Sequence, residues 1–153
     1  MEFEHITTFT IRATPPTSNH FWKTMVRGKI PIVYKTKEAK DFALNVWNQV
    51  VGLGISITEI KIKVERLRFL KVEFEFHQSW LTKTKSKGRA IGEVKKTDLD
   101  NRIKASLDAI CEALGIKDEH VFSLTAQKID AKEDKIVFKL SGTNDLEAFC
   151  EPF

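Results

Sequence analysis

A short stretch after residue 97 holds side chains that could act together on a phosphate. Its acidic residues and its lysine are Asp98, Asp100, Lys104, Asp108, Asp118 and Glu119. Carboxylate oxygens suit Mg²⁺, which usually takes one or two of them and keeps several waters. A bound Mg²⁺ can orient a phosphate, activate a water molecule and stabilise the leaving oxygen, and a lysine can neutralise charge in the transition state. The stretch is therefore a candidate site for metal-dependent hydrolysis of a phosphodiester.

An amphipathic helix is predicted to carry most of this group. Asp100, Lys104 and Asp108 recur every four residues, so on a helix they share one stripe. Gly115 supplies the stop signal of such a helix. Apolar residues at spacings of four, four, three and four form the adjacent core-facing stripe, namely Leu99, Ile103, Leu107, Ile110 and Leu114.

The first two carboxylates can meet only if one of them lies outside the helix. Inside a helix, residues two apart point about 200° away from each other. Asp98 must therefore be the helix cap or the last extended residue before it, and aspartate is a favoured cap. Asp118 joins the site only if the strand after the helix runs back beside Asp98. The structural alternatives are a plain N-cap at Asp98 and a surface ion pair between Lys104 and Asp108.

A basic segment, residues 78–97, directly precedes the acidic group. It holds six cations and one anion, Glu93, whereas the whole chain has a formal net charge of +4. The positive excess therefore lies in this segment, which suits a polyanionic partner. Gly88, Gly92 and the absence of periodicity predict a mobile loop, and a solvated loop without a partner is the alternative. Its cations are Lys83, Lys85, Lys87, Arg89, Lys95 and Lys96.

The rest of the chain predicts one α+β domain over residues 1–153, in which a mixed sheet packs against two main helices. Thr36 is a suitable cap for the first helix. Residues 17–34 are predicted to be irregular. The predicted elements are a strand over 4–13, a helix over 37–51, two strands within 55–77, and a hairpin of strands over 121–129 and 135–140.

Composition excludes several classes of protein. Hydrophobic residues make up 42% of the chain, which favours a folded core over disorder. No apolar run reaches transmembrane length, and the first residues lack the apolar core of a signal peptide. Cys111 and Cys150 lack metal-ligand spacing and indicate a reducing compartment. We therefore expect a cytoplasmic protein with no membrane partner.

Several parts of the sequence resemble the RusA-type Holliday junction resolvases, small endonucleases of bacteria and phages. The acidic group follows the pattern Asp-x-Asp-Asn-x-x-Lys-x-x-x-Asp from Asp98 to Asp108, as that family does. An acid three residues before Val121 and a lysine at Lys128 continue the similarity. Residues 13–19 are similar to the Pro-Pro-Ser-Asn turn that follows the family's first strand. The resemblance thus covers most of the chain.

This resemblance implies a RusA-like fold and Mg²⁺-dependent nicking of four-way DNA junctions by a homodimer, with Mn²⁺ able to replace Mg²⁺. By motif position, Asp98, Asp100 and Asp118 correspond to the catalytic metal ligands and Lys104 to the essential lysine. Glu119 is the alternate third ligand, because two ways of counting along the motif reach different acids.

DNA is expected to contact the basic segment through its phosphates rather than its bases. Phe21 and Trp22 are expected in the core, with stacking on an opened junction as the alternative. A two-fold dimer supplies two equivalent cuts. The rival functions are a flap or branched-DNA nuclease, a junction-binding module with weak or no cleavage, and a protein-interaction domain. Besides the basic segment, the expected DNA contacts are Asn19, Lys23, Asn101 and Lys128.

Overall fold

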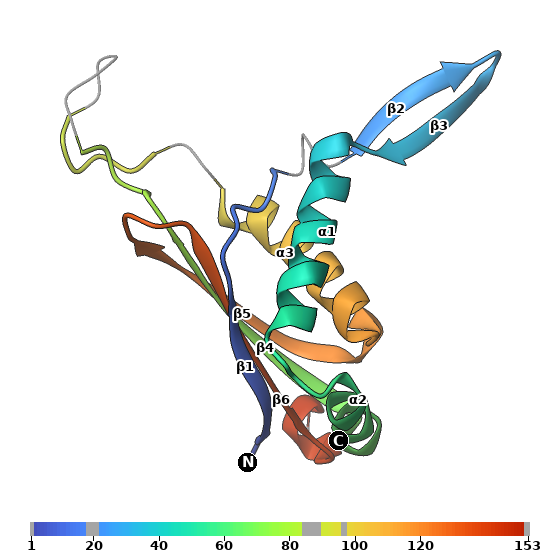
Figure 1. The fold of residues 1–153 in the computed structure, drawn as a ribbon. Helices are drawn as coiled ribbons and strands as arrows, with labels where there is room; N and C mark the ends of the chain where they lie inside the picture. Colours follow the sequence, from blue (N-terminus) through green and yellow to red (C-terminus); the bar gives the residue numbers. More distant parts are fainter. Residues whose placement is uncertain (1, 18–21, 84–89, 96–97, 152–153) are drawn as a thin grey trace.

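The computed structural model describes residues 2–17, 22–83, 90–95 and 98–151. These residues form a four-stranded mixed sheet, a separate two-stranded hairpin and three α-helices (Figure 1). The predicted α+β class is confirmed. The strands are β1 (Glu4–Ile11), β2 (Trp22–Arg27), β3 (Ile30–Lys35), β4 (Phe69–Gln78), β5 (Val121–Asp130) and β6 (Lys135–Thr143). The helices are α1 (Lys37–Gly52), α2 (Ile57–Leu67) and α3 (Leu99–Leu114), with short 3-10 turns at Asp118–His120 and Leu146–Phe149.

The central strand β4 organises the main sheet. It pairs antiparallel with β6 and parallel with β5, which gives the order β1-β6-β4-β5. Its apolar residues Leu70, Val72, Phe74 and Phe76 alternate with partly buried ones and are themselves buried. α1 and α3 pack against each other over one face of this sheet (Figure 1). The core therefore lies between β4 with its neighbours and this helical layer.

The predicted hairpin of the last two strands is wrong in its pairing. Both strands exist, but β4 lies between them. Adjacent strands lie about 4.8 Å apart, so the short connection over residues 131–134 can pass over one strand as easily as join two neighbours. The alternating pattern of β4, buried on every second residue, makes it the better central strand, and the largely exposed β5 takes the edge.

A helix, α2, replaces the first of the two strands predicted within residues 55–77. Ile60, Ile62 and Val64 alternate and therefore favoured a strand, yet Ile62 is exposed. The buried residues are Ile60, Val64 and Leu67, which recur at helical spacing. The Ser56 hydroxyl accepts a hydrogen bond from the Glu59 N–H at 3.3 Å and caps this helix.

Residues 17–34 are also more regular than predicted. The described part of this range forms β2 and most of β3, joined at Gly28, whose φ of +64° suits glycine in a tight turn. Trp22 is exposed rather than buried in the core, so that expectation is wrong, and Phe21 lies outside the described residues.

The two main helices match their predictions. Thr36 caps α1 and accepts a hydrogen bond from the Ala39 N–H at 3.2 Å. Gly115 ends α3 in the left-handed conformation. Within the described residues, no helix has the length and apolarity needed to cross a membrane.

The Thr36 cap gives a direct test of the α1 boundary. We expect Thr36→Ala to lower the free energy of unfolding by about 1 kcal/mol, because the buried Ala39 N–H loses its acceptor. Thr36→Ser keeps the hydroxyl and serves as the control in urea denaturation. Equal losses in the two variants would show that the methyl group, rather than the cap, stabilises this site.

Candidate active site

The first two carboxylates lie where α3 begins. Asp98 is the N-cap residue in an extended conformation, and Asp100 follows in the first helical turn. The side chain of Asp98 makes no capping hydrogen bond, and both residues are exposed. The position outside the helix that the sequence required for Asp98 is confirmed. Its carboxylate is thus available to a ligand rather than used as a cap.

Arg102 fixes this end of α3 against the N-terminal part of the chain. Its guanidinium donates a hydrogen bond to the Pro15 carbonyl, in the segment after β1. Burial lowers the pKa of Arg102, and nearby Asp134 partly offsets that effect. No local sequence pattern predicts this contact, because its two partners lie far apart in the chain.

Lys104 and Asp108 continue the polar stripe along α3. Lys104 is exposed, whereas Asp108 is half-buried. Burial raises the pKa of Asp108, Lys104 lowers it, and the charge of Asp118 raises it further. The charges of Lys104 and Asp118 thus act on the same carboxylate, Lys104 from one turn earlier in α3 and Asp118 from the 3-10 turn after the helix.

The two candidate third ligands differ in their surroundings. Asp118 and Glu119 lie in the 3-10 turn after α3. Glu119 forms an ion pair with Lys117 at 3.7 Å, and its Oε1 lies 3.9 Å from Nε2 of the His120 ring. Besides burial, the negative charge of Asp118 raises the pKa of two groups on α3, Asp108 and Cys111. Burial first, then Asp118, raises the pKa of Cys111 to about 12, so this buried cysteine stays a thiol.

These groups do not converge on one point within the described part of the chain. No three carboxylate, imidazole or thiol groups of the described residues lie close enough to hold a metal ion. α3 has 16 residues, a length of about 24 Å. Asp98 and Asp100 are at its start, and Asp118 follows its end. One chain therefore presents a carboxylate pair and, separately, a third acid.

The pair by itself fits the donor set of Mg²⁺. This ion typically binds through one or two carboxylates and retains several waters. Asp98 and Asp100 supply two exposed carboxylates, and Asp98 has no cap to break before it binds. The chemistry available here is the binding of a hard cation next to a lysine, Lys104, one turn further along the helix.

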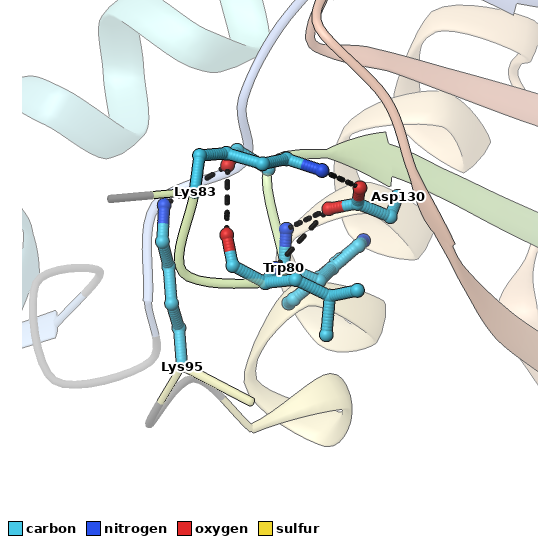
Figure 2. Close-up of polar contacts among 6 residues, drawn as sticks. Trp80, Lys83, Lys95 and Asp130 are labelled. Carbon is cyan, nitrogen blue, oxygen red and sulfur yellow. Dashed lines mark hydrogen bonds and ion pairs between the residues drawn. The ribbon is translucent and has the colours of Figure 1, made fainter. Parts of the chain in front are cut away.

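Asp130 anchors the start of the basic segment (Figure 2). Its Oδ1 accepts hydrogen bonds from the Trp80 N–H at 2.9 Å and the Leu81 N–H at 3.1 Å, and its Oδ2 pairs with Lys83. The Lys83 ammonium, and then the two backbone donors, hold the pKa of Asp130 below its ordinary value. Lys95 donates a hydrogen bond to the Ser79 hydroxyl at 3.0 Å.

The two described ends of the basic segment also pair with each other. The Thr82 N–H donates to the Glu93 carbonyl at 2.9 Å, and the Lys95 N–H donates to the Trp80 carbonyl at 2.8 Å. An isolated antiparallel bridge joins Leu81 to Val94. The prediction of a loop without regular structure missed this ladder, because nothing in the local sequence marks its pairing.

Some of the predicted DNA contacts lie in the described part of the chain, and the others lie outside it. Lys128 lies over the Trp80 ring at 4.6 Å, in a cation–π contact, and Asn101 lies in the first turn of α3. Lys23 is exposed on β2. Lys83 and Lys95 make the contacts given above. The others, Asn19, Lys85, Lys87, Arg89 and Lys96, lie outside the described residues.

A comparison with protein-family models assigns the chain. The model described as endodeoxyribonuclease RusA matches residues 13–141. The chain belongs to the RusA family. RusA proteins are endodeoxyribonucleases that act on branched DNA junctions, so the expected family and enzyme class are confirmed. The match contains the acidic group, the basic segment and Pro15, whose carbonyl accepts the hydrogen bond from Arg102.

Other comparisons add little to the RusA assignment. No curated protein sequence matches the chain. The crystal structure of a 2C-methyl-D-erythritol 2,4-cyclodiphosphate synthase from Plasmodium vivax is similar over 91% of this chain and 94% of that chain, at 12% identity and a TM-score of 0.29. A similarity this low supports no conclusion about this RusA protein.

Asp108 gives a pH test of the stripe on α3. Its pKa in the folded protein is raised above the ordinary value of 3.8. As the pH rises from 3.8 to this higher pKa, the unfolded chain releases the Asp108 proton before the folded protein does, so the folded protein loses stability. We expect Asp108→Asn to be more stable than the parent at neutral pH, with the difference shrinking towards pH 3. Urea denaturation across this range measures it.

The effect should increase when Lys104 is removed, because Lys104 lowers the pKa of Asp108. Asp108→Asn is therefore also compared in a Lys104→Met background. A stability difference that does not change with pH would contradict the electrostatic account.

Proposed function

We propose that this RusA-family protein is a Mg²⁺-dependent endonuclease that resolves four-way DNA junctions by paired symmetric nicks. The observation that carries the proposal is the uncapped Asp98 beside Asp100 at the start of α3, in a chain of an endodeoxyribonuclease family. We place its work in recombination and repair, in the cytoplasm of a bacterium, as a host or phage enzyme.

The proposed roles follow from position and charge. Asp98 and Asp100 hold the metal ion, with Mn²⁺ as a substitute for Mg²⁺. When bound, this ion supplies Lewis-acid stabilisation of the phosphate oxygens. Lys104 lies on the same side of α3 as Asp100 and neutralises charge that develops on the phosphate. Lys128 and the basic segment bind the backbone of the DNA arms.

A homodimer accounts for the separated third acid. A two-fold axis makes each interface contact occur twice. If α3 packs antiparallel to its copy, the partner's Asp118 approaches Asp98 and Asp100, and two equivalent metal sites form. The separation of Asp118 from the pair within one chain favours this arrangement, which also provides the two cuts that a symmetric junction needs. Glu119 remains the alternate ligand.

A second candidate function is junction binding without cleavage. The absence of a three-ligand group among the described residues of one chain favours it, because a monomer with only the pair would hold a metal ion weakly. The basic segment would still bind branched DNA. The two functions differ in turnover and not in affinity.

Cleavage assays separate junction cleavage from junction binding without cleavage. The same assays also test the third alternative, a flap nuclease. The purified protein is incubated with a mobile four-way junction, a flap and a plain duplex, each with Mg²⁺ and with EDTA. We expect symmetric nicks in the junction only, and none with EDTA. Tight binding without nicks at any Mg²⁺ or Mn²⁺ concentration would establish the binding module, and flap cleavage would establish the other nuclease.

Asp100→Asn tests the carboxylate pair. We expect junction cleavage to fall about 100-fold or more, with binding unchanged or tighter because a negative charge near phosphate is lost. Glu65→Gln, an exposed carboxylate on α2, is the control and should cleave normally. Weaker junction binding by Asp100→Asn would show that the carboxylate pair does not lie beside the bound phosphate.

Lys104→Ala tests the proposed charge neutralisation. We expect the single-turnover cleavage rate to fall about 100-fold, while the Kd for the junction changes far less. Separate measurement of binding and turnover distinguishes the two effects. Equal losses in rate and affinity would make Lys104 a simple phosphate contact.

A further inference from the structure

The β2–β3 hairpin projects from the body of the protein as an arm (Figure 1). Every residue from Trp22 to Tyr34 is exposed. The two strands pair with each other as a separate sheet and have no other strand beside them among the described residues. An isolated two-stranded hairpin is at best marginally stable in water. A binding partner that packs against such an arm would therefore stabilise it.

The arm is uniformly basic. Between residues 22 and 35 the chain has four cations, Lys23, Arg27, Lys29 and Lys35, and no acidic residue. Arg27 and Lys29 flank Gly28 at the turn, so two of the charges lie at the tip. Such a concentration of one sign favours a polyanion.

The tip also carries an apolar group. Val26 pairs with Pro31, and Arg27 pairs with Ile30, so these residues lie beside the turn. Val26 is 67% exposed and Ile30 is 68% exposed, at the far end of the arm from the helices. Apolar side chains next to cations at the end of a β-ribbon have the composition of a wedge that enters between base pairs.

The position of the arm relates it to the carboxylate pair. Figure 1 shows that the arm and the described parts of the basic segment, residues 79–83 and 90–95, lie at the same end of the molecule, on either side of the start of α3. Asp98 and Asp100 lie at that start. A polyanion that contacts both extensions therefore passes the pair.

A second copy of the chain is a poorer occupant for the arm. Among the exposed apolar surfaces of the described residues, a groove of about 350 Å³ lies between α1 and α3 and includes Leu44 and Trp47. Lys40 lines this groove together with Lys35, the last residue of the arm, and a single acid, Glu112. These lysines repel a cationic arm, whereas the phosphates of DNA attract it.

We propose that the β2–β3 arm binds the DNA beside the scissile phosphate and that its apolar tip, Val26, Ile30 and Pro31, inserts at the branch point. The proposal rests on the proposed junction function. A two-stranded ribbon fits a DNA groove, Arg27 and Lys29 bind phosphates on the two sides of the tip, and the apolar side chains replace the stacking that the opened bases lose.

The test separates the wedge from the phosphate contacts. One variant is Val26→Ser with Ile30→Ser, and the other is Arg27→Ala with Lys29→Ala. Ile62→Ser removes a comparably exposed apolar residue from α2 and is the control. Each protein is titrated in EDTA onto a four-way junction with 2-aminopurine at the branch point, whose fluorescence rises when the base unstacks.

The parent and the control should raise the fluorescence equally. The Ser variant should keep its Kd within about threefold and lose most of the rise, since unstacking absorbs most of the energy gained by insertion. The Ala variant should bind about tenfold more weakly and lower the salt slope of binding by about 2, because two phosphate contacts are gone.

Four outcomes overturn the proposal. A full fluorescence rise with the Ser variant shows that the tip does not insert. Dissociation of either variant from dimer to monomer in sedimentation velocity assigns the arm to a protein interface. If both variants bind junctions as the parent does and cleave them normally with Mg²⁺, the proposed role of the arm is rejected while the proposed junction function stands. If the parent itself does not bind junctions, the proposed function is rejected as well.

Discussion

The parallel pairing of β4 with β5 is the constraint on which the rest of the structure depends. It brings the carboxyl ends of both strands to one edge, with Gln78 opposite Asp130. Asp130 can then accept hydrogen bonds from the backbone just after β4, and this contact directs the basic segment away from the sheet. The Lys95 N–H donates to the Trp80 carbonyl, so the other described end of the segment returns to the same edge, three residues before Asp98.

Local sequence signals predict the parts of the fold whose partners are near in the chain. Apolar periodicity gave α3, and a capping threonine with a helical stripe gave α1. The same signals misled at α2, where a short alternation at Ile60 to Val64 imitates a strand, and at the arm, where both faces are exposed and no buried stripe exists. The position of β4 between β5 and β6 follows from competition for the centre of the sheet, which no local pattern records.

The candidate site shows the same division. The geometry of a helix required Asp98 to lie outside α3, and it does. Arg102 and Asp130 were not recognised, because Pro15 and Trp80, which they bind, are 87 and 50 residues away. Asp118 lies past the end of α3, as the stop at Gly115 predicts, but whether the next strand brings it back beside Asp98 depends on tertiary packing, which no local pattern records.

The Arg102 hydrogen bond to the Pro15 carbonyl joins the first turn of α3 to the segment that leads from β1 towards the arm. Arg102 lies two residues after Asp100, on the same rigid turn. A shift of the chain at Pro15 therefore changes the orientation of the helix end and of the carboxylates on it. Through this hydrogen bond, a displacement of the N-terminal segment reaches the backbone that carries Asp98 and Asp100; under the proposed function, DNA bound at that segment would therefore alter the geometry of the two carboxylates.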